Sequence, residues 1–139
     1  MSISQAMCTS FKQELMNEEH DLNSDTIKIA LYTSSASLGA STTAYSATNE
    51  ISGTGYSSGG VTLASAALAT SGTTAFADFA DASWTSSTFT ANGAVIYNSS
   101  ASNKAIVVLA FGGDFTVTAG TFSVVFPAAD ASNAIIRLA

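Results

Sequence analysis

The sequence predicts an all-β fold, an antiparallel β-sandwich or jelly-roll-like domain with one N-terminal α-helix. Three observations predict it. Apolar and polar residues alternate over residues 26–33, which is typical of a half-buried strand. Two apolar runs, residues 94–97 and 105–111, are separated by a polar loop and read as paired strands buried on both faces. Helical spacing of apolar residues is confined to residues 2–19.

The length of 139 residues fits a single domain spanning the whole chain, residues 1–139. Within it we expect the N-terminal helix in residues 1–20, a long Ser/Gly/Thr-rich arm or loop in residues 34–60, and the main sandwich in residues 61–139 together with the strand at 26–33. A connection as long as 34–60 in a compact domain is usually functional or mobile. Its large side chains, and so its expected anchors, are Tyr45, Ile51 and Tyr56.

The helix predicted over residues 2–19 has an apolar stripe that includes Phe11 and Leu15, four residues apart, with Cys8 beside them. Ser2 followed by Gln5 resembles a capping box. A helix of this length is marginal alone, so we expect it to dock on the sheet or on another chain. Cys8 is the only cysteine, which excludes an intrachain disulfide, and we interpret it as a small buried apolar residue.

Small turn residues divide the rest of the chain into further strands, giving roughly eight or nine in all with connections short enough for antiparallel pairing. Asn92-Gly93 is the strongest of these signals, because Asn-Gly is typical of two-residue hairpin turns. A predicted turn at residues 70–72 separates strands at 61–69 and 73–79, and a last short strand covers residues 135–138. The remaining turn signals lie at residues 98–104, 112–113 and 119–120.

The charge pattern argues against nucleic-acid and membrane partners. Net charge is −6, and the four cations are scattered rather than clustered as phosphate binding requires. No apolar run approaches the length of about 20 residues that a membrane-spanning helix needs. No basic residue precedes an apolar run at the N-terminus, so we expect synthesis in a cytoplasm without a secretion signal.

Two segments resemble ligand-binding loops but lack required residues. The glycine-rich segment 53–60 has Ser58 where a dinucleotide fingerprint has its third glycine, and no P-loop lysine follows. The segment 21–25 carries acids at calcium-loop spacing, but Thr26 stands where that loop needs glycine. We interpret both as turns.

The sequence predicts no enzyme. His20 is the only histidine, and no Ser-His-acid or Cys-His set can be assembled with it. Asp78 and Asp81 are interpreted as solvated or loop-capping acids, and Trp84 as a core or interface anchor. We therefore expect no catalytic residue, no cofactor and no metal site.

Five segments, in this order, resemble small virion proteins of tailed bacteriophages: SDTIKIALYT (24–33), NEISGTGYSSGG (49–60), FADFADASW (76–84), ANGAVIYN (91–98) and GTFSVVFP (120–127). The resemblance covers nearly the whole chain. It implies a particle component without catalytic residues, and leaves open a capsid decoration (cement) protein, a head–tail piece or a tail component.

The cement hypothesis implies a protein made in the host cytoplasm and placed on the capsid surface, where it binds the major capsid protein, as decoration proteins commonly do as homotrimers. The alternative is a tail or head–tail component whose loops bind host glycans through Tyr45, Tyr56 and Trp84. The candidate partner contacts lie on the helix and the long loop: Phe11, Leu15, Tyr45, Ile51 and Tyr56.

Overall fold

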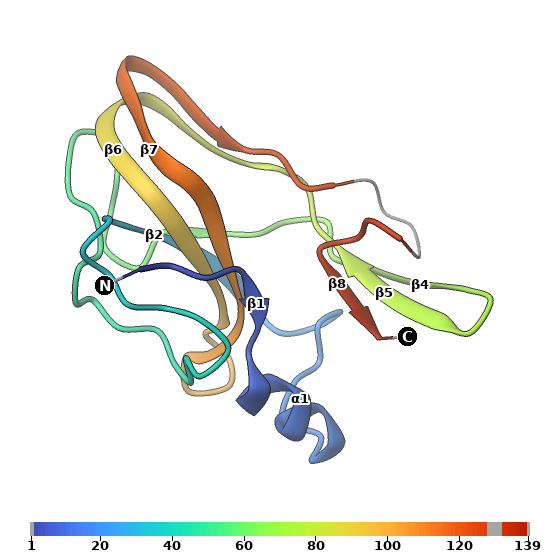
Figure 1. Cartoon of the computed structure of the whole chain (residues 1–139). Coiled ribbons are helices and arrows are strands. Elements are labelled where there is room, and N and C mark those ends of the chain that lie inside the picture. The colour runs from blue at the N-terminus through green and yellow to red at the C-terminus, as the bar shows by residue number, and fades with distance from the viewer. Residues whose placement is uncertain (1, 128–131, 139) are drawn as a thin grey trace.

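The computed structural model describes residues 2–127 and 132–138, and within them the chain forms one helix and eight strands in two antiparallel sheets (Figure 1). The five-stranded sheet has the order β1-β7-β6-β2-β3, and the three-stranded sheet the order β4-β5-β8. This confirms the predicted all-β class with one N-terminal helix. Residues 1, 128–131 and 139 of the expected domain lie outside the described residues. The elements are β1 (Ala6–Met7), α1 (Thr9–Met16), β2 (Ile27–Tyr32), β3 (Val61–Thr62), β4 (Ala67–Ser71), β5 (Thr74–Asp78), β6 (Ala82–Asn98), β7 (Lys104–Val124) and β8 (Ile136–Leu138).

The large sheet is built on one long hairpin, β6 and β7, of 17 and 21 residues. The polar loop predicted between the two apolar runs does connect them, and the strands pair from Asn98↔Lys104 outward. β2 adds to the other edge of β6, from Ile27↔Asn98 to Tyr32↔Gly93. These inner halves are buried on both faces, as their continuous apolar runs predict.

The prediction of a hairpin turn at Asn92-Gly93 is wrong, because both residues lie inside β6. Gly93 pairs with Tyr32 on one side and Ala110 on the other. A Cβ on Gly93 would lie 2.6 Å from the carbonyl oxygen of Leu109 and 2.7 Å from the Ile3 side chain. The glycine is therefore required by close packing rather than by a turn.

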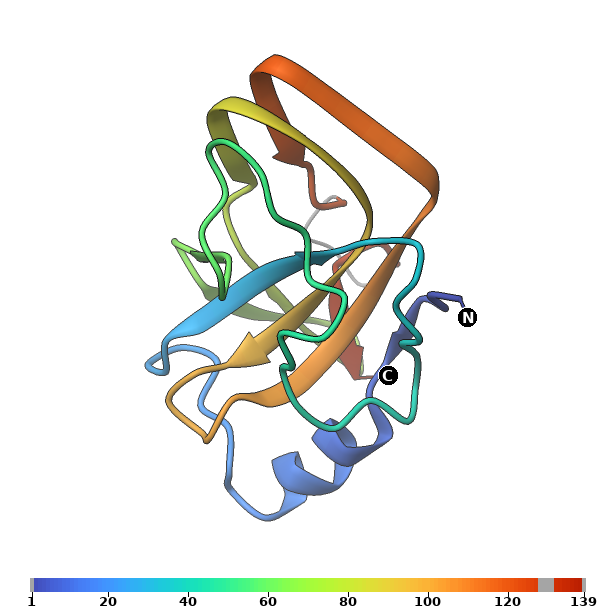
Figure 2. The same ribbon diagram turned by 90° about the vertical axis from the view of Figure 1, so that its left-hand side faces the viewer.

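The predicted turns at Gly112-Gly113 and Ala119-Gly120 are likewise not turns between strands, since both lie inside β7. They coincide instead with corners of that strand, where Gly112 has φ 82° and Ala119 has φ 47°. The outer half of the hairpin bends back over the molecule between these corners (Figure 2). Register shifts along the β6–β7 pair accompany the bending.

The predicted helix over residues 2–19 is too long, because α1 begins only at Thr9. Before it, Ala6 and Met7 pair with β7, and the Cys8 N–H donates to the Ile106 carbonyl over 2.9 Å. The predicted capping box does not form, since Cys8 is the N-cap residue. Pairing with a distant strand provides partners for the backbone N–H and C=O groups of residues 6–8, and this overrides the local helical spacing.

Residues 34–60 form a loop that lies along the large sheet rather than a free arm. The Tyr45 N–H donates to the Asn103 carbonyl and the Ile51 N–H to the Leu31 carbonyl. The loop runs over one face of the sheet, whereas α1 and the small sheet lie toward the other (Figures 1 and 2). As a result β2 is buried on both faces, with Ala30 and Tyr32 as inaccessible as Leu31, and the prediction of a half-buried strand is wrong.

The prediction of one strand over residues 61–69 is wrong, because Val61–Thr62 form β3 in the large sheet and β4 begins only at Ala67. The strands predicted at 73–79 and 135–138 correspond to β5 and β8 of the small sheet. β4 and β5 form a hairpin whose turn includes Gly72. β8 pairs with β5 through Ala75↔Leu138 to Ala77↔Ile136. Residues of both sheets belong to one hydrophobic core, to which Ala77 and Ile136 contribute from the small sheet.

Candidate functional site

Glu50 holds the long loop together. Its carboxylate accepts hydrogen bonds from the hydroxyl groups of Tyr45 (2.6 Å) and Tyr56 and from the Gly59 N–H (2.8 Å). The Tyr56 hydroxyl also accepts the Leu31 N–H over 3.0 Å, which ties the cluster to β2. Burial, and then the hydrogen bond to Glu50, raise the pKa of both tyrosines above the ordinary value. The hydroxyl groups therefore stay neutral donors.

The remaining two tyrosines of the chain point from the sheet into the same loop. The Tyr32 hydroxyl donates to the Ser46 carbonyl and the Tyr97 hydroxyl to the Gly59 carbonyl, both over 2.6 Å. Tyr97 stacks on Tyr45 with ring centroids 4.7 Å apart. All four hydroxyl groups are committed to contacts within the chain, so this cluster anchors the loop.

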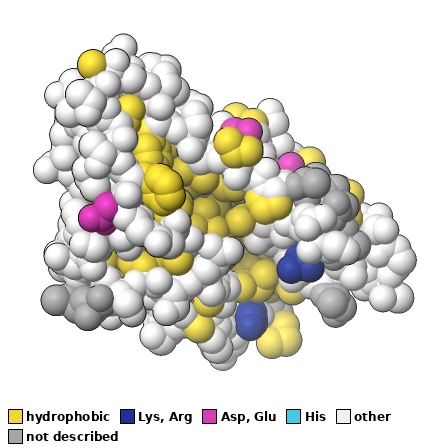
Figure 3. Space-filling view, turned by 45° about the horizontal axis from the view of Figure 1, so that its top comes forward, with side chains coloured by type: hydrophobic (Ala, Val, Ile, Leu, Met, Phe, Trp, Pro, Cys, Tyr) yellow, Lys and Arg dark blue, Asp and Glu magenta, His cyan; other side chains and the backbone are white. Residues whose placement is uncertain are grey.

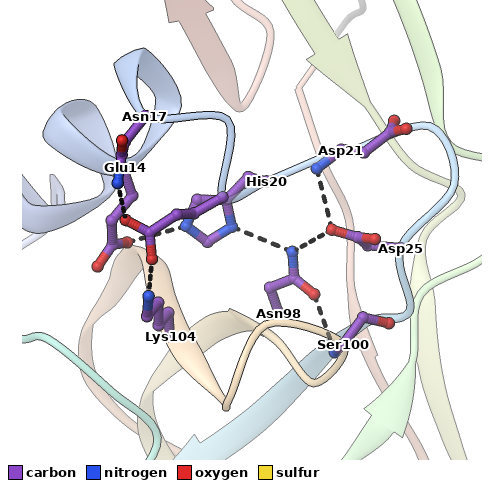
Figure 4. Close-up of polar contacts among 9 residues, drawn as sticks. Glu14, Asn17, His20, Asp21, Asp25, Asn98, Ser100 and Lys104 are labelled. Carbon is purple, nitrogen blue, oxygen red and sulfur yellow. Dashed lines mark hydrogen bonds and ion pairs between the residues drawn. The ribbon is translucent and has the colours of Figure 1, made fainter.

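His20 joins the helix to the central hairpin (Figure 4). The Ser100 N–H donates to Asn98 Oδ1, so the Asn98 amide nitrogen faces His20 Nδ1 at 3.0 Å and Asp25 Oδ2 at 2.7 Å. His20 Nδ1 is then an acceptor, and Nε2 donates to Glu14 Oε1 over 2.9 Å. With both ring nitrogens engaged and the side chain fully buried, His20 offers no position to a substrate.

Asp21, Asp81 and Cys8 have structural roles, whereas Asp78 Oδ1 is neither solvated nor capping, because it is buried without a hydrogen-bond partner among the described residues. Asp21 Oδ1 accepts the backbone N–H groups of Asn23 and Ser24, which confirms the predicted turn. Asp81 Oδ1 accepts the Phe126 N–H over 2.9 Å. Cys8 is fully buried, and burial, with a smaller effect of Glu14, raises the pKa of its thiol to about 11.

An apolar groove of about 780 Å³ lies between α1 and the small sheet, and we call it the helix groove. Phe11 and Leu15 line it from the helix, and Phe76 and Leu68 from the small sheet. Leu68 and Leu138, which also lines it, are 56% and 48% exposed. Large apolar side chains exposed together in a hollow are typical of protein-interaction sites.

The rim of the helix groove is acidic. Glu18 and Asp21 line it and are exposed. Glu18 lies just beyond the end of α1 with φ 61°, and its N–H donates to the Leu15 carbonyl. The groove thus combines an apolar floor with a negative edge, which suits an apolar side chain flanked by cations.

A second apolar groove, of about 530 Å³, lies under the bent outer half of β7, and we call it the hairpin groove. Figure 3 shows hydrophobic side chains gathered along a hollow on this side of the molecule. Phe111, Phe115 and Phe122 line the groove, and Phe115 is 53% exposed. Val125, 72% exposed, lies at its C-terminal end.

The five candidate partner contacts are now located. Phe11 and Ile51 are buried in the core, so their side chains offer little surface to a partner. Leu15 is half-buried at the helix groove, and Tyr45 and Tyr56 are half-buried in the Glu50 cluster. Sequence reasoning missed Leu68 and Leu138, whose positions in short strands gave no sign that their side chains face outward.

Trp84 is not a surface platform, because it is 3% exposed and packs edge-on against Phe89 and Phe122. The expectation of an exposed Trp84 in the glycan-binding alternative is therefore wrong. Its burial fits the other interpretation of this residue, a core anchor.

Within residues 2–127 and 132–138, no group of three or more His, Cys, Asp or Glu side chains could hold a metal ion. In the same part of the chain, no helix has the length and apolar character needed to cross a membrane. Comparison with protein-family models, with curated proteins and with solved structures finds no significant match to this chain.

Proposed function

We propose that this chain is a non-enzymatic structural protein of a tailed-phage virion, a capsid decoration protein that binds the major capsid protein and stabilises the head. The helix groove is the observation that carries the proposal, because it exposes Leu68 and Leu138 beside a hollow of about 780 Å³. The resemblance of five ordered segments to phage virion proteins supports the choice of particle. The homotrimer that this resemblance implies stays a prediction of the resemblance alone.

The groove suits a loop of the major capsid protein that carries an apolar side chain flanked by Lys or Arg. Its floor is apolar, and its rim holds Glu18 and Asp21. The chain as a whole carries a net charge of −6, so a basic partner segment is attracted at long range as well. Binding would bury the exposed leucines, Leu68 and Leu138, against the capsid protein. Each would contribute roughly 1–2 kcal/mol to the free energy of binding when fully covered.

Binding to heads assembled without this chain tests the proposal. We expect the purified protein to bind such heads to saturation and to raise the temperature at which they release DNA. Leu68→Asp is expected to weaken binding by about tenfold or more, because it places a charge against the apolar partner surface. Thr90→Asp is the matched control: Thr90 is exposed on the outer face of the hairpin, away from the groove, and its substitution leaves binding unchanged.

Two results would contradict the proposal. One is equal binding by the wild type and by Leu68→Asp, provided that both unfold at similar temperatures. The other is immunogold labelling of intact virions at the tail tip alone, which would favour the tail-component alternative and make glycan binding by Tyr45 and Tyr56 the next hypothesis to test.

A further inference from the structure

The outer half of β7 has an edge with no neighbouring strand. Between the corners at Gly112 and Ala119, β7 pairs with β6 on one side, through Ala91↔Phe115, Thr90↔Thr116 and Phe89↔Val117. On the other side β1 reaches only Val107 and Val108, and no other described residue pairs there. Figure 2 shows this stretch as the outermost strand of the sheet.

The backbone of Thr116 points its hydrogen-bonding groups toward that open edge. The Thr90 and Thr116 hydroxyl oxygens are 2.8 Å apart, as expected for a non-hydrogen-bonded pair, in which opposing side chains lie closest. In keeping with this, the Thr88 N–H on the same side of β6 donates away from β7, to the Thr54 carbonyl. In an antiparallel ladder, a residue of such a pair directs its N–H and C=O away from its partner.

This edge carries little of the protection that edge strands usually have. Its one charge is Asp114, which accepts a hydrogen bond from the Asn92 amide on β6, and the irregular pairing lies outside residues 115–117. Residues 113–118 read Gly-Asp-Phe-Thr-Val-Thr, with no Lys and no Pro. Phe115, Thr116 and Val117 line the hairpin groove, and Thr116 and Thr118 are exposed. The segment is therefore a regular amphipathic strand that is paired on only one side, a ready template for a further strand.

We infer that the edge pairs with the same edge of a second copy of this chain, antiparallel about a two-fold axis at Thr116. The sequence is self-complementary in this register. Phe115 lies opposite Val117 of the partner subunit, an aromatic–β-branched pair, and Thr116 lies opposite Thr116 of the partner subunit. Asp114 lies opposite Thr118 of the partner subunit, so no like charges meet.

The pairing makes one continuous sheet from two large sheets. It also brings the two hairpin grooves together and covers part of Phe115, which is 53% exposed in the single chain. The contact is isologous, so it closes at two copies. It therefore differs from the homotrimer that the family resemblance implies, and it does not depend on the proposed capsid role.

Sedimentation equilibrium of the purified chain tests the inference. We expect a concentration-dependent mass approaching twice the 14.1 kDa of one chain. Thr116→Lys is expected to raise the dimer Kd by about tenfold or more, since it sets two ammonium groups opposite each other across the two-fold axis. Thr90→Lys is the matched control, because Thr90 is its exposed neighbour on β6 and leaves the dimer intact.

Thr116→Pro is a second test, because proline removes the edge N–H without removing a bond to β6. It too is expected to abolish the dimer. In amide hydrogen exchange, the Thr116 N–H becomes protected as protein concentration rises, whereas that of Thr90 does not change with concentration. A monomer up to millimolar concentration, a trimer, or a dimer unaffected by both Thr116 variants would overturn the inference.

Discussion

Glu50 is the residue on which the long loop most depends. It is half-buried and accepts bonds from Tyr45, Tyr56 and the Gly59 N–H. Glu50→Gln keeps the shape but replaces a charged acceptor by a weaker one and adds donors that have no partner. We expect a loss of about 1–3 kcal/mol in the free energy of unfolding, measured by urea denaturation. An unchanged midpoint would mean that the loop is held by apolar contacts such as Ile51.

The two tyrosines that bind Glu50 are expected to differ in their effects. Tyr56→Phe should cost about 2 kcal/mol, because the Leu31 N–H loses its acceptor as well. Tyr45→Phe should cost about 1 kcal/mol, because the Tyr45 hydroxyl bonds mainly to the side chains of Glu50 and Ser58, and the nearby Gly59 N–H keeps Glu50 as its acceptor. Equal losses in urea denaturation would argue against a special role for the Leu31 contact.

Asp25 makes the stability of the fold depend on pH in the acid range. The hydrogen bonds from the Asn98 amide and the Asp21 N–H hold the pKa of its carboxyl below the ordinary value. Because the folded pKa is depressed, the contribution is complete above the unfolded pKa of about 4 and is lost as pH falls through the folded value. We expect Asp25→Asn to flatten thermal stability against pH below about 4. A profile identical to that of the wild type would exclude Asp25 as the source.

At this scale the sequence could predict which side chains anchor the loop, but not what they bind. Tyr45, Ile51 and Tyr56 stand out because they are the large residues in a stretch of small ones. Glu50 carries no such signal, because one acid in a polar loop is ordinarily solvated. The available clue was that three of the four tyrosines lie within or beside one loop, and that this loop contains a single acidic residue.

Among the elements, β6 is the one whose continuity depends on a single glycine. Gly93→Ala would place a methyl group 2.6 Å from the Leu109 carbonyl oxygen. We expect a loss of about 1–3 kcal/mol in the free energy of unfolding from this overpacking. Gly113→Ala on β7 is the control, because nothing lies within 4 Å of its added Cβ, and its effect should be near zero. Equal effects of the two variants would contradict the packing role of Gly93.

The errors in predicting the elements have a common cause. Asn92-Gly93 is a strong local turn signal, and residues 2–8 fit a local helical spacing, yet both segments take their structure from pairing with distant parts of the chain. Gly93 lies beside Leu109, and Met7 pairs with Val107. Such contacts join residues far apart in the chain, so no local pattern reveals them. Where neighbouring residues decide, as at the polar loop between β6 and β7, the prediction is confirmed.

At the scale of the whole molecule, the described residues leave apolar grooves and a strand edge uncovered. The loop of residues 34–60 covers one face of the large sheet, and α1 with the small sheet covers much of the other. The helix groove and the outer edge of β7 remain open. One suits an apolar and basic segment of a different protein, and the other suits a second copy of this chain. Under the two proposals, the helix groove holds the protein on the capsid lattice and the edge of β7 joins it to a second copy.

The central claim is the proposal that this chain is a capsid decoration protein, and locating the chain in the proposed particle tests it most directly. In a cryo-electron microscopy reconstruction of the particle, the account predicts density for this fold repeated over the outer surface of the head. The helix groove, with Leu68 and Leu138, should face the major capsid protein in each copy. Density confined to the neck or to the tail tip, with the head surface bare, would contradict the account.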